Sequence, residues 1–350
     1  MKFTVVTIGC QQNEYDASRL AIFLKSAGFV ESAAKEAEVI FILACSVRQM
    51  AVDRIYGRVK NWAEDKKVIV TSCLTPEDQK KITDRGAFYW QFGDIKLLEK
   101  ILGEEISNKT FSQSSDSVYV PIMTGCNNFC SYCIVPYTRG REKSRSTDEI
   151  IKEVSELISS GKKQIILLGQ NVNSYEITQK SKIKSQSYNS KFKTDFAILL
   201  EQINNLDGDF EISFMSNHPK DMTAEVINVI AKLPKVNKEI HLPLQSGSDK
   251  ILKAMNRPYS SKQYLELVSS LKSHISKLKL TTDIIVGFPG ETEEDFQQTV
   301  EVCKKVGYSL AYINKYSPRK GTAAYKLGDP ISWSEKQRRW RILEEIINRK

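Results

Sequence analysis

Predicted strands and helices alternate along almost the whole chain, and this alternation is the feature that most constrains the fold. The first part contains three apolar runs that read as strands, at 3–8, 38–44 and 67–72. Each run is followed by a segment with helical periodicity, at 14–27, 49–65 and 76–85. Strands that alternate with helices of this length form parallel sheets covered by helices. We therefore predict an open parallel α/β sheet domain over residues 1–108.

A second alternating series follows a serine-rich segment, 109–117, that we interpret as a linker. Its predicted strands lie at 118–123, 164–168, 210–215, 239–242, 279–286 and 310–316. These units are too few for a closed eight-stranded barrel, so we predict a partial (β/α)6 barrel over residues 118–350. In such folds the chemistry lies at the carboxyl ends of the strands.

Composition narrows the class of protein. Apolar residues make up 41% of the 350 residues and charged residues 27%, which is ordinary for a globular protein. No apolar run approaches the ~20 residues of a membrane span, so we expect no membrane association and a cytoplasmic location. Seven cysteines are too few and odd in number for a disulfide scaffold. The net charge of +9 favours a polyanionic partner.

The most specific motif is a C-x3-C-x2-C run formed by Cys126, Cys130 and Cys133, just after the first strand of the second series. Three thiolates on one loop can bind three irons of a 4Fe–4S cluster and leave the fourth iron open. A zinc site is the alternative, but His218, His241 and His274 are not spaced as a zinc-binding pair.

This run, with an aromatic residue before its last cysteine, resembles the radical S-adenosylmethionine (SAM) superfamily. The resemblance implies that SAM binds the open iron and that Tyr132 packs on its adenine ring. Further cofactor contacts are implied at the ends of successive strands, by Gly169, Gln170, Asn171, Ser216, His218, Gln245 and Ser246. Taken singly, each of these segments is an ordinary strand-to-helix turn.

Three other cysteines, Cys10, Cys45 and Cys73, each follow a strand of the first domain. Because the carboxyl ends of parallel strands share one edge, these thiols should meet in space. Spacing alone leaves two alternatives open: a second cluster, or buried inert thiols. Cys303 lies on a predicted helix, and we interpret it as an inert core thiol.

Longer motifs around these cysteines resemble the methylthiotransferases. They are Thr7-Ile8-Gly9-Cys10-Gln11-Gln12-Asn13, then Cys45-Ser46-Val47-Arg48, then Cys133-Ile134-Val135-Pro136-Tyr137-Thr138-Arg139-Gly140-Arg141-Glu142. By this resemblance, the Cys45-Ser46-Val47-Arg48 motif favours the branch that acts on isopentenyladenosine in tRNA over the branches that act on a ribosomal protein or on threonylcarbamoyl-adenosine. This resemblance implies a second 4Fe–4S cluster on Cys10, Cys45 and Cys73 and the use of two SAM molecules per turnover.

The resemblance also implies the reaction and the partners. A methylthio group would be added to C2 of N6-isopentenyladenosine at tRNA position 37, with the anticodon stem-loop as the recognised element. Electrons would come from a donor such as flavodoxin or ferredoxin. Arg139, Arg141 and Arg145 are candidate contacts to RNA phosphates, although surface arginines are often only solvated. A methylthiotransferase for threonylcarbamoyl-adenosine tRNA or a ribosomal protein is the alternative, and a non-catalytic iron–sulfur carrier or RNA-binding module is a more distant one.

Several positions depart from the family pattern. Ser72 precedes Cys73 where glycine is usual, and Leu43-Ala44 precede Cys45 where Asn-Thr is usual. We expect only local adjustment. The family carries a C-terminal TRAM domain, which we expect this chain to lack. A lysine-rich segment, 177–194, is expected to be a surface insertion, and Trp333 and Trp340 are expected to be core anchors of the last helix.

Overall fold

The computed structural model describes residues 1–45, 49–106, 117–176 and 194–349. The chain forms two compact units, Met1–Tyr119 with Tyr137–Arg139, and Val120–Pro136 with Gly140–Lys350. Nearly all of the expected linker and of the lysine-rich insertion lies outside the described residues, as do Ser46, Val47 and Arg48. No helix within the described ranges is long and apolar enough to span a membrane.

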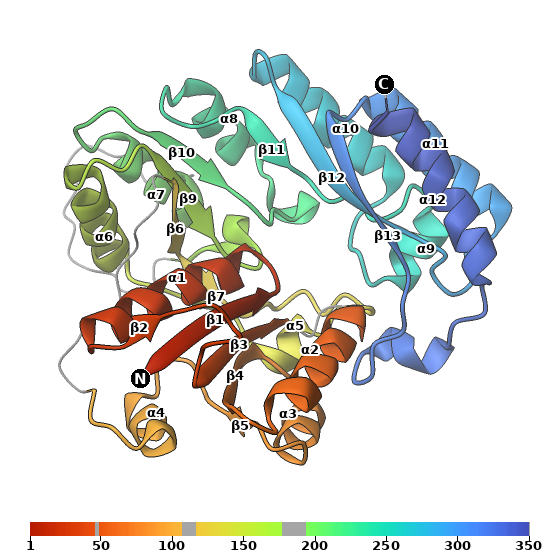
Figure 1. Ribbon diagram of the computed structural model, residues 1–350. Coiled ribbons are helices and arrows are strands. Elements are labelled where there is room, and N and C mark those ends of the chain that lie inside the picture. The colour runs from red at the N-terminus through yellow and green to blue at the C-terminus, as the bar shows by residue number, and fades with distance from the viewer. Residues whose placement is uncertain (46–48, 107–116, 177–193, 350) are drawn as a thin grey trace. The chain divides into compact units, whose positions relative to one another are not determined.

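The first unit is built on a five-stranded sheet in the order β2-β1-β3-β4-β5, and all of its strand pairs are parallel (Figure 1). The strands are β1 (Lys2–Ile8), β2 (Val30–Glu31), β3 (Val39–Cys45), β4 (Lys67–Cys73) and β5 (Phe88–Tyr89). The helices are α1 (Gln11–Ser26), α2 (Gln49–Trp62), α3 (Pro76–Thr83) and α4 (Ile95–Leu102). This confirms the open parallel sheet, to which the structure adds the two-residue strands β2 and β5.

Alternate residues of β3 enter two separate cores, because successive side chains of a strand point to opposite faces. Phe41 and Leu43 pack with residues of α1 and α4, including Leu20 and Leu98. Ile40 and Ile42 pack with residues of α2 and α3. Every residue of β3 is buried, which is typical of a central parallel strand with helices on both faces. This central position places Cys45 between the ends of β1 and β4.

Two three-stranded sheets follow along the chain, in the orders β10-β9-β6 and β11-β12-β13, and the pairs β9–β10, β11–β12 and β12–β13 are parallel (Figure 1). An isolated parallel bridge between Ile212 and Val236 links the end of the first sheet to the segment before β11. The six strands therefore follow one another in chain order as a partial barrel, which confirms the predicted fold class. They are β6 (Ser117–Pro121), β9 (Gln164–Leu168), β10 (Glu211–Phe214), β11 (Glu239–His241), β12 (Lys279–Val286) and β13 (Leu310–Lys315).

Helices connect these strands. They are α5 (Val135–Thr138), α6 (Thr147–Ser159), α7 (Asp195–Asn204), α8 (Ala224–Lys232), α9 (Asp249–Ala254), α10 (Ser261–His274), α11 (Glu293–Val306) and α12 (Trp333–Ile347). A small hairpin pairs β7 (Met123–Thr124) with β8 (Lys143–Ser144), and short 3-10 turns are η1 (Val172–Ser174), η3 (Pro219–Asp221) and η4 (Ala323–Leu327).

Thr292 and Asp295 form a reciprocal capping box at the start of α11. The two tryptophans that were predicted to be core anchors fare differently. Trp333 is not a core anchor, because 62% of it is exposed and its ring lies beside the Lys315 ammonium group instead, with Nζ 4.8 Å from the ring centroid. Trp340 is partly buried, and its indole N–H donates to the Ile313 carbonyl.

Candidate iron–sulfur and cofactor sites

The loop with Cys126, Cys130 and Cys133 is shaped by glycine and by backbone hydrogen bonds. Gly125 has φ +80°, and a Cβ atom there would lie 2.1 Å from the Arg141 carbonyl oxygen. Only glycine fits this position without displacing backbone. The Cys126 N–H donates to the Gly140 carbonyl, and the Cys133 N–H donates to the Cys130 carbonyl. These contacts fold the three cysteines of the motif into one compact loop.

The segment after α9 supports this loop from behind. The Ser131 N–H donates to the Met255 carbonyl over 2.9 Å, and the Asn256 side chain donates to the Phe129 carbonyl over 3.0 Å. Arg257, only 8% exposed, lies 3.4 Å from the Cys130 sulfur through Nη1. Burial alone would lower the pKa of Arg257, but Tyr132, Tyr259 and Cys130 outweigh it and raise that pKa. Arg257 therefore stays charged beside a candidate ligand, a role that the sequence analysis missed.

Burial keeps the Cys133 and Cys126 thiols protonated near neutral pH unless a cation binds them. Burial raises the pKa of Cys133 to about 12 and also raises the pKa of Cys126. Such thiols ionise only when a strong positive charge binds them, and a metal ion supplies that charge. No three His, Cys, Asp or Glu side chains in the described part of the chain converge on a single-ion site. A cubane cluster does not need such convergence, because each thiolate binds a different iron.

Buried polar atoms without partners gather at the strand ends that follow this loop. Among the described residues, the side-chain atoms that lack any hydrogen-bond partner there are Gln170 Oε1, Asn171 Oδ1, Asn217 Oδ1, His218 Nε2 and Gln245 Oε1. They follow β9, β10 and β11. Buried polar atoms are nearly always paired, so this group indicates a ligand that supplies the missing partners.

His218 shows which kind of partner is missing. Its Nδ1 accepts a hydrogen bond from the Lys220 N–H, and burial with the nearby Arg257 and Lys220 charges lowers its pKa to about 2. A neutral ring whose Nδ1 accepts carries its proton on Nε2. The buried Nε2–H is thus a donor aimed at an absent acceptor, such as a ribose hydroxyl or a carboxylate oxygen.

The remaining predicted cofactor residues divide into two groups. Ser216 and Gln245 adopt left-handed backbone conformations, with φ +67° and +68°, and such conformations concentrate at ligand sites. Ser246 is instead used internally, because its hydroxyl accepts from the Ser248 N–H and lies 3.4 Å from Thr299 Oγ1. Tyr132 packs against a cluster that includes Phe288 and Tyr316. Its stacking on adenine stays a prediction, as does a cofactor role for Gly169.

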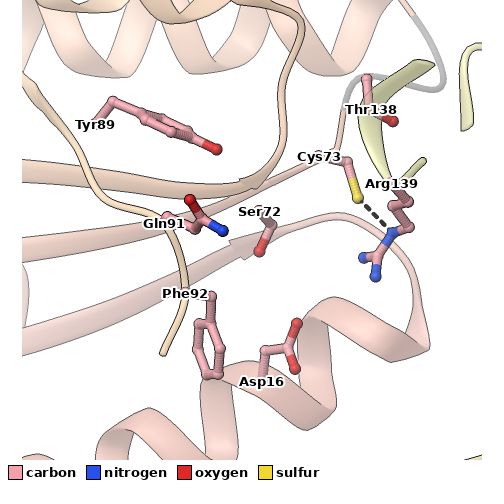
Figure 2. Close-up of a pocket in the computed structure, with 8 residues that line it drawn as sticks. All are labelled: Asp16, Ser72, Cys73, Tyr89, Gln91, Phe92, Thr138 and Arg139. Carbon is pink, nitrogen blue, oxygen red and sulfur yellow. Dashed lines mark hydrogen bonds between the residues drawn. The ribbon is translucent and has the colours of Figure 1, made fainter. Parts of the chain in front are cut away.

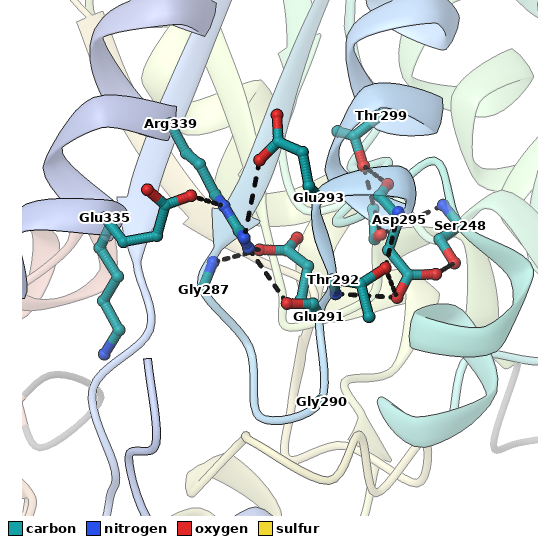
Figure 3. A network of polar contacts seen from close by, with 12 residues as sticks. Ser248, Gly287, Gly290, Glu291, Thr292, Glu293, Asp295, Thr299, Glu335 and Arg339 are labelled. Carbon is teal, nitrogen blue, oxygen red and sulfur yellow. Dashed lines mark hydrogen bonds and ion pairs between the residues drawn. The ribbon is translucent and has the colours of Figure 1, made fainter. Parts of the chain in front are cut away.

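The turn after β12 is fixed by a buried ion pair from the last helix (Figure 3). The Glu291 carboxylate accepts from the Gly287 N–H and from Arg339 Nη1, both at 2.6 Å. The side chains of Glu291 and Arg339 are 1% and 5% exposed. Helix α12 thereby determines the shape of the turn after β12.

In the first unit, the three cysteines lie at the ends of neighbouring strands. Cys45 and Cys73 are register partners on β3 and β4, and Cys10 follows β1, which pairs with β3 on its other side. Cys10 is exposed, whereas Cys45 and Cys73 are buried, and none of the chain's seven cysteines is disulfide-bonded. Asn13 ties two of these strand ends together, since its amide donates to the Ala44 carbonyl and its Oδ1 accepts from Cys10 Sγ.

Cys73 has an electrostatic environment of its own. Burial raises the pKa of its thiol to about 12, Arg139 opposes this effect, and the nearby Cys45 and Cys10 sulfurs add to it. Ser72 before it has φ +83°, so the family's usual glycine would relieve strain that serine retains. Its buried hydroxyl finds no hydrogen-bond partner within the described ranges.

The three candidate RNA-contacting arginines have different surroundings. Arg141 is exposed, with its guanidinium carbon 4.3 Å from the centroid of the Phe129 ring. Arg145 donates to the Pro121 carbonyl and pairs with Glu153 at 2.7 Å. Arg139 donates through Nε to the Cys73 sulfur at 2.7 Å, and Figure 2 shows its guanidinium directed at that sulfur. Their contacts with RNA stay predictions, and Arg141 is the most available of the three.

Comparison with known protein families assigns both parts of the chain. Residues 120–303 match the radical SAM superfamily, and residues 2–90 match the uncharacterized protein family UPF0004. The tRNA-2-methylthio-N(6)-dimethylallyladenosine synthase of Clostridium botulinum (strain Okra / Type B1) is 40% identical over 99% of this chain and 81% of its own length. The enzyme of the same name from Clostridium perfringens (strain SM101 / Type A) is also 40% identical, over 99% of this chain and 82% of its own length.

Solved structures with similar folds belong to radical SAM enzymes. The methyltransferase TsrM from Kitasatospora setae, with cobalamin and a 4Fe–4S cluster bound, matches with a TM-score of 0.64 at 11% identity, over 93% of this chain and 77% of TsrM. The cobalamin-dependent radical enzyme OxsB matches with a TM-score of 0.57 at 10% identity, over 98% of this chain and 56% of OxsB. At this identity the likeness concerns the fold alone.

Proposed function

Since this chain belongs to the radical SAM superfamily and, within it, to the family of tRNA-2-methylthio-N(6)-dimethylallyladenosine synthases, we propose that it methylthiolates tRNA. The product would be 2-methylthio-N6-isopentenyladenosine at position 37, formed by substitution at C2 of the isopentenylated adenine. What supports this proposal is the presence of two groups of three cysteines in one chain, together with 40% identity over 99% of its length to a synthase of that name.

At the first site, Cys126, Cys130 and Cys133 would bind three irons of a 4Fe–4S cluster. A cluster held there would bind SAM, which would supply the radical chemistry needed to remove the unreactive C2 hydrogen of adenine. The chain's own residues would bind and orient the cofactor, with His218 donating from Nε2 and the unpartnered oxygens of Gln170, Asn171 and Gln245 accepting. Arg257 adds a fixed positive charge beside Cys130.

At the second site, Cys10, Cys45 and Cys73 would bind the cluster that carries the sulfur to be transferred. Their strand ends fit this role, because β1, β3 and β4 are adjacent and parallel and Asn13 fixes the Cys10 turn. A cavity of about 330 Å³ borders Cys73, which leaves space beside the sulfur-bearing edge. The family's use of two SAM molecules assigns one to methylation of that sulfur and one to radical formation.

The partners follow from charge and chemistry. The net charge of +9 suits a polyanionic substrate, and an RNA loop presents its bases for chemistry more readily than a duplex does. We propose the anticodon stem-loop as the recognised element and a flavodoxin or ferredoxin as the electron donor. Arg141, exposed and stacked on Phe129, is the first candidate for a phosphate contact.

The test is an anaerobic assay with the reconstituted full chain, SAM and a strong reductant. Three stem-loop RNAs would be compared, with isopentenyl-adenosine, threonylcarbamoyl-adenosine or plain adenosine at position 37, and their nucleosides would be identified by mass spectrometry. We expect methylthiolation of the isopentenyl RNA alone. Methylthiolation of the threonylcarbamoyl RNA alone would move the chain to the other branch of the family.

Variants separate the two sites in the same assay. Cys130→Ala should abolish both 5′-deoxyadenosine and product, whereas Cys45→Ala should leave 5′-deoxyadenosine formation and abolish the methylthio product. Cys303→Ala is the matched control, because this thiol is buried on α11 and belongs to neither site. It should retain both activities.

A further inference from the structure

A short segment belongs structurally to a different unit from the residues on either side of it. Tyr137–Arg139 packs with the first unit, although Pro136 and Gly140 belong to the second. Within the first unit, Thr138 and Arg139 line the cavity beside Cys73 (Figure 2). The sequence that carries the C-x3-C-x2-C loop therefore also supplies a cation to the other three-cysteine site.

The contact between Arg139 and Cys73 is short and directional. Arg139 Nε lies 2.7 Å from Cys73 Sγ, and this is the hydrogen bond that the described part of the chain gives to the guanidinium group. Asp16 of α1, 9% exposed, lines the same cavity, and its carboxylate accepts a hydrogen bond from Gln12. Arg139 interacts electrostatically with Cys73, Asp16 and Cys10. Arg139 is thus a cation that acts on both sulfurs and on Asp16, and Arg19 acts on Asp16 as well.

The charge of Arg139 acts on the Cys73 sulfur beside it. Its guanidinium is charged at every accessible pH, so its electrostatic effect on the sulfur is permanent. A hydrogen bond from a cation to a ligand sulfur stabilises extra negative charge on an iron–sulfur cluster, and such bonds tune its reduction potential. The reduced cluster carries more negative charge than the oxidised one, so Arg139 should favour reduction.

We propose that Arg139 is a positioning residue of the N-terminal three-cysteine site, which holds the Cys73 sulfur and raises the reduction potential of the cluster bound there. This inference rests on the proposed function, because it requires a cluster on Cys10, Cys45 and Cys73. It assigns Arg139 a role distinct from the contact with RNA phosphates that its sequence position suggests.

The experiment isolates this site in the full chain. Cys126, Cys130 and Cys133 are replaced by alanine, the protein is reconstituted anaerobically with iron and sulfide, and iron is counted. The cluster is then titrated with mediators and followed by electron paramagnetic resonance. Arg139→Gln and Arg139→Lys are compared in this background. Arg85→Gln is the matched control, because Arg85 is an exposed arginine of the same unit that contacts the Tyr56 ring and the Lys81 carbonyl.

Arg139→Gln should lower the equilibrium constant for reduction at least tenfold, which is about 59 mV for a one-electron couple. Arg139→Lys keeps the charge but lacks the planar Nε–H, and it should lower the equilibrium constant for reduction at least threefold. Arg85→Gln should match the parent. The proposal is overturned if both Arg139 variants bind iron and titrate at the parent's potential.

Two other outcomes are equally decisive. If Arg139→Gln fails to load iron, the reduction potential of Arg139→Lys is the test instead. An unchanged potential in that variant overturns the proposal. If the parent itself binds no iron, the second cluster of the proposed function is refuted, and the role of Arg139 falls with it. Failure of the inference alone therefore appears as normal iron content with an unshifted potential.

Discussion

Replacement of Arg339 by methionine tests whether helix α12 fixes the turn after β12. The Arg339 guanidinium pairs with Glu291 at 2.6 Å and with Glu335 at 2.7 Å, and the Glu291 side chain is almost fully buried. Methionine keeps most of the apolar stem and removes the charge. The Glu291 carboxylate then stays buried with the Gly287 N–H but without its cation.

The expected cost follows from the burial of this pair. Removing one partner of a buried ion pair destabilises a protein by about 3–5 kcal/mol. For a unit of this size, that corresponds to a loss of roughly 6–20 °C in melting temperature. Burial already raises the pKa of Glu291, and loss of Arg339 raises it further, so the carboxyl can escape part of the cost by protonation. The destabilisation should therefore be larger at pH 8 than at pH 5.

The assay is differential scanning calorimetry of the cluster-free protein under anaerobic conditions, which resolves separate transitions of the two units. Arg338→Met is the control, because Arg338 is 45% exposed and its ion pairs with Glu335 and Glu293 lie at the surface. That change should cost less than about 1 kcal/mol. The double variant Glu291→Gln/Arg339→Met should recover most of the loss. If Arg339→Met melts within 1 °C of the parent, or if the double variant is no more stable than the single one, the buried ion pair does not hold the turn.

Three further predictions concern single side chains. Ser72→Gly should stabilise the cluster-free chain by about 1 kcal/mol, because it relieves the positive φ and removes an unsatisfied hydroxyl. Chemical denaturation measures this gain, and Ser72→Ala, which removes only the hydroxyl, should gain less. Equal gains in the two variants would show that φ is unimportant. Burial alone would raise the pKa of Asp295, but hydrogen bonds from Lys250, Thr292 and Ser248 outweigh it and lower that pKa to about 2. The ionised Asp295 carboxylate stabilises the fold above its pKa in the unfolded chain, which is near 4, and this effect is lost as the pH falls. The parent's stability advantage over Asp295→Asn should therefore shrink by about 1 kcal/mol between pH 5 and pH 3. A constant difference in stability would contradict this prediction. In nitrogen-15 spectra of labelled protein, the His218 ring should stay neutral, with its proton on Nε2, from pH 5.5 to pH 8.5. A titration of this ring near pH 6.5 would contradict the prediction.

The fold was largely predictable because its strands carry strong local signals. The predicted strand 279–286 coincides with β12, and the Thr292–Asp295 box marks the start of α11. The two-residue edge strands β2 and β5 were not predicted, since two residues carry no periodic pattern. Trp333 was misplaced because a tryptophan at the start of a helix reads as a core residue, whereas here its ring covers the surface beside Lys315.

The site was predictable where residues form contiguous motifs and not where distant segments meet. The cysteine loop and the strand-end polar residues were visible in the sequence, and four of those residues, Gln170, Asn171, His218 and Gln245, carry unpartnered buried atoms. Arg257 was missed because a lone arginine before a proline gives no signal of the thiol that it approaches. The partner of Arg139 lies 66 residues away in the sequence, so only the tertiary structure reveals it.

In the proposed function, this chain couples radical chemistry at one cysteine site to sulfur transfer from the other. A single anaerobic turnover with isopentenyl-adenosine stem-loop RNA and SAM labelled with deuterium in its methyl group tests this coupling directly. We expect a methylthio nucleoside that carries the deuterated methyl, formed with one 5′-deoxyadenosine and one S-adenosylhomocysteine per product. Formation of 5′-deoxyadenosine with an unchanged nucleoside, in protein loaded with iron at both sites, would contradict it.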